Sequence, residues 1–468
     1  FFLYIIFVII LFLFILGIAP LSFQNDTLFD ISLGDKYIND VISTIDEYSI
    51  HENLEYTPQH FMVNIITYLI YNFSGFFGLY IWCIILTCIL AFLFYVANKL
   101  FVKNKLISYL FVFAELSILT PFISIRAQMY SYIFFLLELI FIEKFLRSKQ
   151  YKYLIPLSIL PLFIINFHAG TIYFYFIIIF VYLLNYIKIK TSKIEYNKDY
   201  VTNLKYLLIP IIFGILFTFV NPFGYNQIMY CVKTLSNSFI NAYISEFQPI
   251  NIKNTCGEFF YIYLLLIVVS ILYTKKKITL RHFSLFVIFT VPCLEYIEEL
   301  VIKFKNLLYK GITKQGVKVL RITIIAMYLL IAICFSFKNS FSNNRAGYLP
   351  KSVYPIDSVN YIKENIGNNS RIFNEYTYGS LLMFNDIKCF IDSRCDLYTK
   401  EYNKDCTVAE DYINAINCTG NYEEILSKYN IEYLLISKDS ALAKNIFNNS
   451  KCEKIFEDKI SYVIKVNH

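Results

Sequence analysis

LYIWCIILTCILAFLFYVA, residues 79–97, is an apolar stretch without a charged side chain. A helix rises about 1.5 Å per residue, so about 20 apolar residues are needed to cross the roughly 30 Å hydrocarbon core of a bilayer. The length and composition of this stretch therefore predict a membrane-spanning helix.

Comparable apolar runs recur through the first 340 residues and indicate about ten spans. The chain is 57% hydrophobic and 16% charged, with a mean hydropathy of +0.52, which is more apolar surface than one water-soluble core can bury. We therefore predict a polytopic α-helical membrane protein and exclude a soluble enzyme. The predicted spans are residues 1–19, 79–97, 106–123, 129–146, 154–167, 172–186, 207–220, 259–273, 282–297 and 322–337.

Two of the apolar segments need separate interpretation. The chain begins with Phe1 rather than Met, so we expect residues to precede it. Residues 1–19 are longer than a typical signal-peptide core and are followed by no small-residue cleavage site, which favours a retained helix. Residues 61–71 are too short to span, and we expect them to lie at the membrane interface or to line the protein interior.

Charged residues orient the predicted spans. Lysine and arginine cluster after alternate spans, which places those loops in the cytoplasm. The loop 21–60 has eight acidic residues against the single Lys36, and it falls on the external side with Arg126 and the loops 166–170 and 221–255. The net charge of +7 is thus a topology signal, and no nucleic-acid partner is predicted.

The tail after residue 338 changes character, because long apolar runs stop and polar residues increase. We divide the chain into a transmembrane domain, 1–338, and a soluble α/β domain, 339–468, of two or three layers. If 282–297 does not cross, the tail is extracytoplasmic, which we favour; if it crosses, the tail is cytoplasmic. The expected elements are helices at 353–365, 422–429 and 440–447, strands at 371–374, 388–392 and 431–437, and a hairpin at 454–466.

Cysteine usage predicts no metal centre. The eleven cysteines are scattered and form no C-x-x-C pair, so neither a structural metal site nor a disulfide framework is indicated. We expect no cofactor, and a divalent metal has no support in this pattern.

Three ionisable residues near the external ends of spans are the first candidates for chemistry. Asp26 could act as a base or bind a sugar hydroxyl or a metal, although a solvated loop acid is the simpler interpretation. Arg126 could clamp a phosphate with two N–H groups, or merely snorkel at a helix end. His168, in a tight turn, could donate to a phosphate or cap the turn.

Further candidates lie in the loops and the tail. His60 stands where the first external loop re-enters the membrane, and Glu246 is an external acid for which a solvated position is the simpler interpretation. Asp392 and Arg394 follow a predicted strand end, a common position for binding residues. A structural Arg–Asp pair that holds this loop is the alternative, and we favour it slightly.

The order of these motifs resembles bacterial members of the GT-C glycosyltransferases, polytopic proteins that transfer sugars from polyprenyl-phosphate carriers outside the cytoplasm. The resemblance covers nearly the whole chain and is closest to an uncharacterised branch. The first motif, residues 26–34, is similar to D-T-x-x-[HD]-[IL]-x-x-G. The other matching segments are residues 58–60, 126–128, 166–170, 221–225, 246–249, 374–379 and 390–394.

The resemblance implies an inverting transfer from a lipid-linked sugar to an extracytoplasmic glycan, lipid or protein acceptor. Asp26 matches the acid that deprotonates or orients the acceptor hydroxyl, and Arg126 and His168 are the candidates for holding the phosphate. Asp30 stands where many relatives have His, so Asp26, Asp30 or both do the work. The region between residues 277 and 281 is short by about one helix relative to the family pattern.

Two alternatives keep the same fold class. A non-catalytic envelope assembly or binding protein would use the tail as a binding module. A lipid-linked sugar transporter is disfavoured, because the spans show no inverted repeat and polar residues gather at one membrane face.

Overall fold

The computed structural model describes residues 2–188 except 41, 203–243, 255–273, 277–280 and 347–467 except 448 and 449, with isolated positions between these ranges. The helices of the first part are α1 (Phe2–Ile18), α2 (Asn25–Asn39), α3 (Phe61–Phe101), α4 (Lys105–Leu119), α5 (Ala127–Ser148), α6 (Leu154–His168), α7 (Ile172–Leu183), α9 (Leu208–Thr218), α10 (Tyr225–Ser236), α11 (Ser238–Tyr243) and α12 (Thr255–Tyr273). Two short strands, β1 (Ile194–Glu195) and β2 (Ile278–Thr279), pair in parallel.

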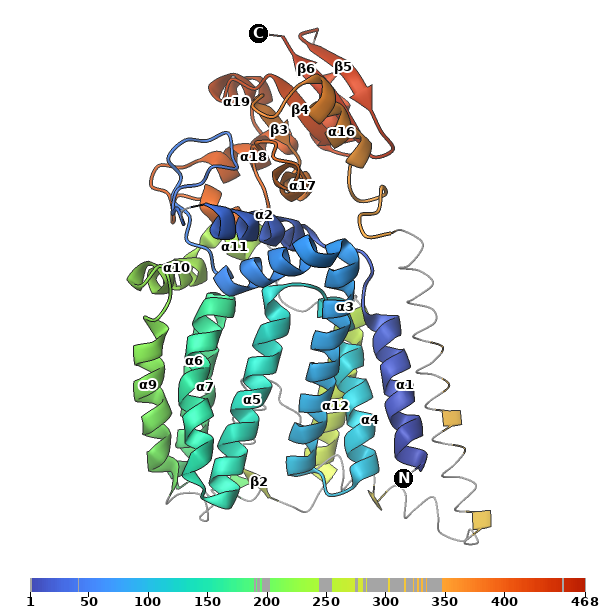
Figure 1. Cartoon of the computed structure of the whole chain (residues 1–468), viewed down its shortest axis with the longest axis vertical. Helices are drawn as coiled ribbons and strands as arrows, with labels where there is room; N and C mark the ends of the chain where they lie inside the picture. Colours follow the sequence, from blue (N-terminus) through green and yellow to red (C-terminus); the bar gives the residue numbers. More distant parts are fainter. Residues whose placement is uncertain are drawn as a thin grey trace.

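The long apolar helices stand side by side as a bundle (Figure 1). Within the described residues, Phe61–Phe101, Lys105–Phe122 and Tyr151–Tyr186 are long and apolar enough to cross a membrane, and shorter apolar helices accompany them. Each predicted span up to 259–273 coincides with a helix, whereas 282–297 and 322–337 fall almost entirely outside the described residues. The chain is therefore a helical membrane protein, as its composition predicts.

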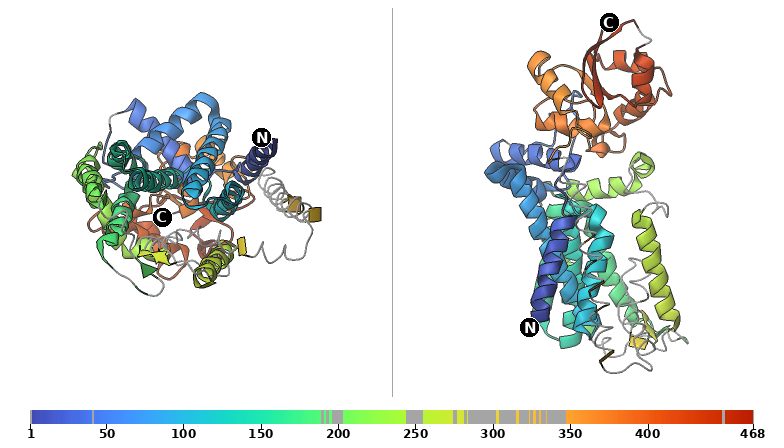
Figure 2. Two further views of the ribbon diagram at one scale, coloured as in Figure 1. Left: turned by 90° about the horizontal axis from the view of Figure 1, so that it is seen from below. Right: turned by 90° about the vertical axis from the view of Figure 1, so that its right-hand side faces the viewer.

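The loop 21–60 differs from the expectation of a plain polar loop, because it contains α2. The acidic residues of this loop obscure an apolar pattern: Leu28, Phe29 and Leu33 are buried against the C-terminal part of the chain, and Ile31 is buried against the bundle. A helix with apolar side chains on two faces must be covered on both. In two views α2 indeed lies between the bundle and the C-terminal domain (Figures 1 and 2).

The first part of α3, which includes residues 61–71, lies across the end of the bundle before the chain turns along the bundle (Figure 1). The turn is at Ser74 and Gly75, whose backbone angles are not helical. Gly75 has φ of +61°, a conformation that glycine adopts without the steric penalty of a side chain. The turn therefore joins two helical parts, one that lies across the end of the bundle and one that runs along it.

The C-terminal domain is α/β, as predicted. Its mixed sheet has the order β3-β4-β6-β5, with β3 and β4 parallel and the other pairs antiparallel. The expected strand at 388–392 is not part of this sheet; Cys389 instead forms an isolated bridge with Ser49 of the loop 21–60. The elements are α16 (Ile356–Asn365), β3 (Ile372–Asn374), α17 (Gly379–Phe384), α18 (Val408–Ile416), α19 (Tyr422–Lys428), β4 (Tyr433–Ser437), α20 (Ala441–Ile446), β5 (Cys452–Glu457) and β6 (Ser461–Val466).

Candidate functional site

The start of α2 places an acid against a cation. Asp26, in the first turn of α2, forms an ion pair with Arg126, which immediately precedes α5. The neighbouring Thr27 is fully buried and donates a 2.9 Å hydrogen bond to the carbonyl of Ile125. The D-T pair thus fastens α2 to the loop before α5, which holds the carboxylate beside the guanidinium. Their side chains are 22% and 18% exposed, so both are reachable from solvent.

One turn further along α2, Asp30 is 1% exposed. Its Oδ1 lies 3.9 Å from Nδ1 of His60 and accepts a 2.7 Å hydrogen bond from the amide of Asn64 when that amide is oriented to donate. Its Oδ2 has no hydrogen-bond partner among the described residues. Burial raises the pKa of Asp30 from 3.8 to about 6, with the His60 contact acting in the opposite direction. Asp30 is therefore a buried, incompletely satisfied carboxyl group.

A glycine explains how Asp30 and Asn64 come so close. A Cβ on Gly34 would lie 2.1 Å from the carbonyl oxygen of Asn64 and 2.6 Å from Cβ of Tyr68. Any other residue would push α2 away from α3. The last position of the D-T-x-x-D-I-x-x-G motif is thus required by packing between the two interfacial helices.

The two histidines predicted from separate motifs lie together. The rings of His60 and His168 are 5.1 Å apart in an edge-to-face arrangement. His168 Nδ1 is 2.7 Å from Oγ of Ser131, and the carbonyl of Gln59 accepts a 3.0 Å hydrogen bond from Ala169. The P-Q-H and N-F-H-A-G segments, far apart in sequence, therefore form one unit.

The C-terminal domain contributes a further acid to this end of the bundle, one that our site prediction did not include. Asp396 Oδ2 accepts a 3.1 Å hydrogen bond from the side chain of Gln59. Burial raises the pKa of Asp396, opposed by the hydrogen bond from Gln59 and by the nearby His60. Asp396 lies in the same sequence segment as Asp392, and spacing alone offers no signal that distinguishes the two acids.

Asp392 and Arg394 lie in a different cluster. Arg394 donates 2.6 Å hydrogen bonds to both Asp46 and Asp392, and the hydroxyl of Tyr398 donates to Asp392 at 2.6 Å. Asp392 and Arg394 are 0% and 3% exposed. Burial alone would raise the pKa of Asp46, but Arg394 and Ser49 hold it below its usual value. The cluster joins the loop 21–60 to the C-terminal domain, as the structural alternative for this Arg–Asp pair has it.

Two expectations from the sequence concern Glu246 and the binding of a metal ion. Glu246 lies outside the described residues. In the part of the chain that the structure describes, no group of three or more His, Cys, Asp or Glu side chains is arranged to hold a metal ion.

Comparisons with known proteins identify a fold. No protein-family model and no curated protein sequence matches the chain. The archaeal oligosaccharyltransferase AglB from Archaeoglobus fulgidus, solved in complex with an inhibitory peptide and a dolichol-phosphate, superposes with a TM-score of 0.59 at 10% sequence identity. This chain has a GT-C-like fold. The apo form of the Archaeoglobus fulgidus oligosaccharyltransferase gives a TM-score of 0.53 at 11% identity.

The two matches cover 89% of this chain and 66% of each neighbour, so the chain spans about two thirds of the neighbours' length. At this identity the likeness concerns the fold alone, because one fold hosts many activities. The fold part of the resemblance seen in the sequence is confirmed, and the activity has to be argued from the site.

Proposed function

We propose that this protein is an inverting membrane glycosyltransferase that moves a sugar from a polyprenyl-phosphate donor to an extracytoplasmic acceptor. The observation that carries the proposal is the Asp26–Arg126 pair, a partly exposed acid and cation held together at the end of the bundle. A transfer reaction with a phosphate leaving group needs these two group types side by side: a base for the acceptor and a positive charge for the phosphate.

Arg126 has the more clearly defined role. Its guanidinium presents several N–H groups in a planar fork, so it can hold the Asp26 carboxylate and a phosphate oxygen at the same time. The positive charge of Arg126 stabilises the negative charge that develops on the phosphate as it leaves the anomeric carbon. A donor bound in this way would have its reacting carbon close to Asp26, which lowers the entropic part of the barrier.

Asp26 is the better candidate for the base than Asp30. Asp26 is 22% exposed, whereas Asp30 is 1% exposed and faces His60 and Asn64. In the proposed reaction Asp26 accepts the proton of the acceptor hydroxyl while that oxygen attacks the anomeric carbon. The bond to the phosphate oxygen breaks on the opposite side, so the configuration inverts and no covalent intermediate is needed.

The two histidines form the proposed wall of the donor site. His60 and His168 face each other next to Asp30, and either ring can donate a hydrogen bond to a phosphate oxygen. Glu246 remains a proposed acceptor-binding residue. We do not extend substrate binding to Asp392 and Arg394, because their polar atoms are buried and already paired with one another.

Two arguments support the location and the substrates. The acidic loop 21–60 carries the site, and the scarcity of lysine and arginine in it favours the external face; the C-terminal domain lies on the same side as α2 (Figure 1). The neighbour of similar fold was solved with a dolichol-phosphate and a peptide, which supports a lipid-phosphate donor and makes a protein one acceptor class to test.

The test uses the full-length protein in proteoliposomes with a panel of radiolabelled polyprenyl-phosphate monosaccharides. The reaction contains an extract that supplies the acceptor, and release of free polyprenyl phosphate is measured. This product forms whichever acceptor receives the sugar, so the acceptor need not be identified. We expect Asp26→Asn to lower the rate by about 10²- to 10⁴-fold, the usual contribution of a general base. The matched control is Asp35→Asn, since Asp35 is an exposed acid on the same helix. Full activity of a correctly inserted Asp26→Asn variant would eliminate the base role.

The non-catalytic alternative makes the opposite prediction. A binding protein with this fold would show no donor turnover for any sugar of the panel, and its cellular role would depend on the C-terminal domain rather than on Asp26. Deletion of residues beyond 346 compared with Asp26→Asn in the same cells distinguishes the two functions.

A further inference from the structure

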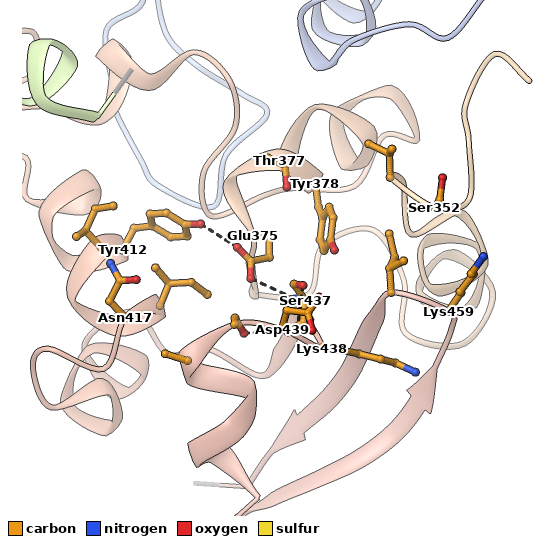
Figure 3. Close-up of a pocket in the computed structure, with 16 residues that line it drawn as sticks. Ser352, Glu375, Thr377, Tyr378, Tyr412, Asn417, Ser437, Lys438, Asp439 and Lys459 are labelled. Atoms are coloured by element: carbon orange, nitrogen blue, oxygen red, sulfur yellow. Dashed lines mark hydrogen bonds between the residues drawn. The ribbon is translucent and has the colours of Figure 1, made fainter. Parts of the chain in front are cut away.

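The C-terminal domain contains a cavity of about 700 Å³ whose lining includes neither Asp26 nor Arg126. It lies where β3 and β4 end, beside α18 and the start of α20 (Figure 3). Because β3 and β4 are parallel, their carboxyl ends open at the same edge of the sheet. Connections that diverge from such an edge leave a crevice, and ligands of α/β sheets commonly bind there.

Glu375, which directly follows β3, lines the cavity. Its Oε1 accepts a 3.2 Å hydrogen bond from the backbone N–H of Ser437, and its Oε2 accepts a 3.1 Å hydrogen bond from the hydroxyl of Tyr412. Both bonds are visible in Figure 3. Burial raises the pKa of Glu375, and these two hydrogen bonds act in the opposite direction. The carboxyl group is thus held in one orientation, with each oxygen fixed by a different element.

The lining of the cavity has balanced charge and many hydroxyl groups. Two lysines, Lys438 and Lys459, stand against two acids, Glu375 and Asp439, so neither an anion nor a cation is favoured overall. The rings of Tyr378 and Tyr412 provide apolar surface, and the other polar lining residues are Ser352, Thr377, Asn417, Ser437 and Ser440. This lining matches a ligand that has both hydroxyl groups and apolar C–H faces. The hydroxyl, amide and carboxylate side chains can form hydrogen bonds with the ligand's hydroxyl groups, and the aromatic rings can pack against its C–H faces.

We propose that this cavity is a binding site for a neutral oligosaccharide segment, separate from the transfer site. The size fits, because 700 Å³ lies within the range of about 300–1,000 Å³ typical of small-ligand sites. The two sites have different linings: Glu375 lines the cavity, while the hydroxyl of the neighbouring Tyr376 donates to the carbonyl of Ser393, in the segment that leads to Asp396. The inference does not depend on which residue is the base in the proposed transfer.

The test measures binding by the full-length protein in a detergent without a sugar headgroup, so that the detergent does not compete. The probes are maltotetraose, cellotetraose and chitotetraose, with trigalacturonate as an acidic comparison, followed by saturation-transfer NMR and calorimetry. We expect at least one neutral tetrasaccharide to bind at millimolar concentration or below, and trigalacturonate to bind at least tenfold more weakly.

Variants at the rim locate the binding. Asn417→Trp and Thr377→Trp place an indole in the cavity from exposed positions, and each should weaken binding at least tenfold. Asn414→Trp is the matched control, because Asn414 is exposed on α18 but does not line the cavity. Asp26→Asn should bind the probe like the unaltered protein, so loss of transfer and loss of binding can be told apart. The proposal is overturned if no neutral probe binds, or if both rim variants bind as tightly as the control.

Discussion

Two clusters of acids and arginine occupy this molecule, and they differ in how completely their polar atoms are paired. In the first, Asp26 and Arg126 are partly exposed, and the adjacent Asp30 has an oxygen without a hydrogen-bond partner among the described residues. In the second, the buried side chain of Arg394 donates two hydrogen bonds to Asp392 and one to Asp46, and the hydroxyl of Tyr398 donates a further one to Asp392.

This difference indicates that the first cluster can bind a ligand, whereas the second holds two parts of the chain together. A buried ion pair whose hydrogen bonds are all made gains nothing by binding a ligand, and it loses several kcal/mol when one partner is removed. A partly exposed pair beside an incompletely paired carboxyl group retains capacity for another ligand. Residue types alone do not distinguish the two clusters; burial and pairing do.

The largest expected effect on stability is that of Arg394→Ala. This change leaves Asp46 and Asp392 charged and buried without their cationic partner, which should destabilise the C-terminal domain and its joint with the loop 21–60 by about 3–5 kcal/mol. Thermal unfolding in detergent, followed by limited proteolysis between the two parts, measures it. The exposed ion pair Lys400–Glu410 offers a control, because Lys400→Ala should change stability by less than about 1 kcal/mol. An unchanged melting temperature of Arg394→Ala would show that the joint carries no stability.

In contrast to Arg394→Ala, Arg126→Ala should affect the transfer rate more than the stability. The side chain is 18% exposed, so its removal should lower stability less than removal of the buried Arg394 does. Loss of a charge that stabilises the leaving phosphate should lower the transfer rate by about 10²- to 10³-fold. Arg126→Lys restores the charge but not the planar fork, and a partial recovery is expected. Activity close to that of the unaltered protein in Arg126→Ala would remove the phosphate clamp from the proposal.

Asp30 should make the stability of the first cluster pH-dependent. Its pKa is raised from 3.8 to about 6 by burial, so the folded state binds its proton more tightly than the unfolded state does. Stability from this group is therefore highest below pH 3.8 and falls as pH rises to about 6, by about 3 kcal/mol in all. In Asp30→Asn this part of the pH dependence should vanish. Melting temperatures of both proteins between pH 4 and pH 8 measure it, and parallel curves would contradict the buried carboxyl group.

The apolar pattern of the sequence predicts the bundle helices because the hydrocarbon core of a membrane sets both their length and their composition. In hydrocarbon a helix must be long and mostly apolar, so the run 79–97, which has no charged residue, and the run 106–123, whose single charged residue is Glu115, are read directly from the sequence. The helix α2 was not predicted, because its buried side chains face two different layers and its acids resemble those of a solvated loop. The strand expected at 388–392 has a β-like composition, but it pairs with Ser49 rather than with the sheet, a long-range contact that no local pattern contains.

The candidate site was predictable to a similar degree. The resemblance singled out Asp26, Arg126, His60 and His168, and the fold brings them to one end of the bundle. It could not separate Asp396, which contacts Gln59, from Asp392, which pairs with Arg394. These acids lie a few residues apart in an irregular segment, where no periodicity fixes the direction of a side chain.

The smallest expected effect concerns Gly34, which decides whether the first cluster can form. A Cβ at this position would lie 2.1 Å from the carbonyl oxygen of Asn64; this is backbone, so α2 and α3 must move apart. Gly34→Ala should lower stability by about 1–3 kcal/mol and should lower activity further, because the shift separates Asp30 from Asn64. Gly420→Ala is a suitable control, since its Cβ would have ordinary contacts, the nearest 3.5 Å away. Thermal unfolding and donor turnover, measured on the same preparations, test whether the close approach of the two interfacial helices serves the site; if Gly34→Ala matched Gly420→Ala in both, the motif glycine would have no packing role.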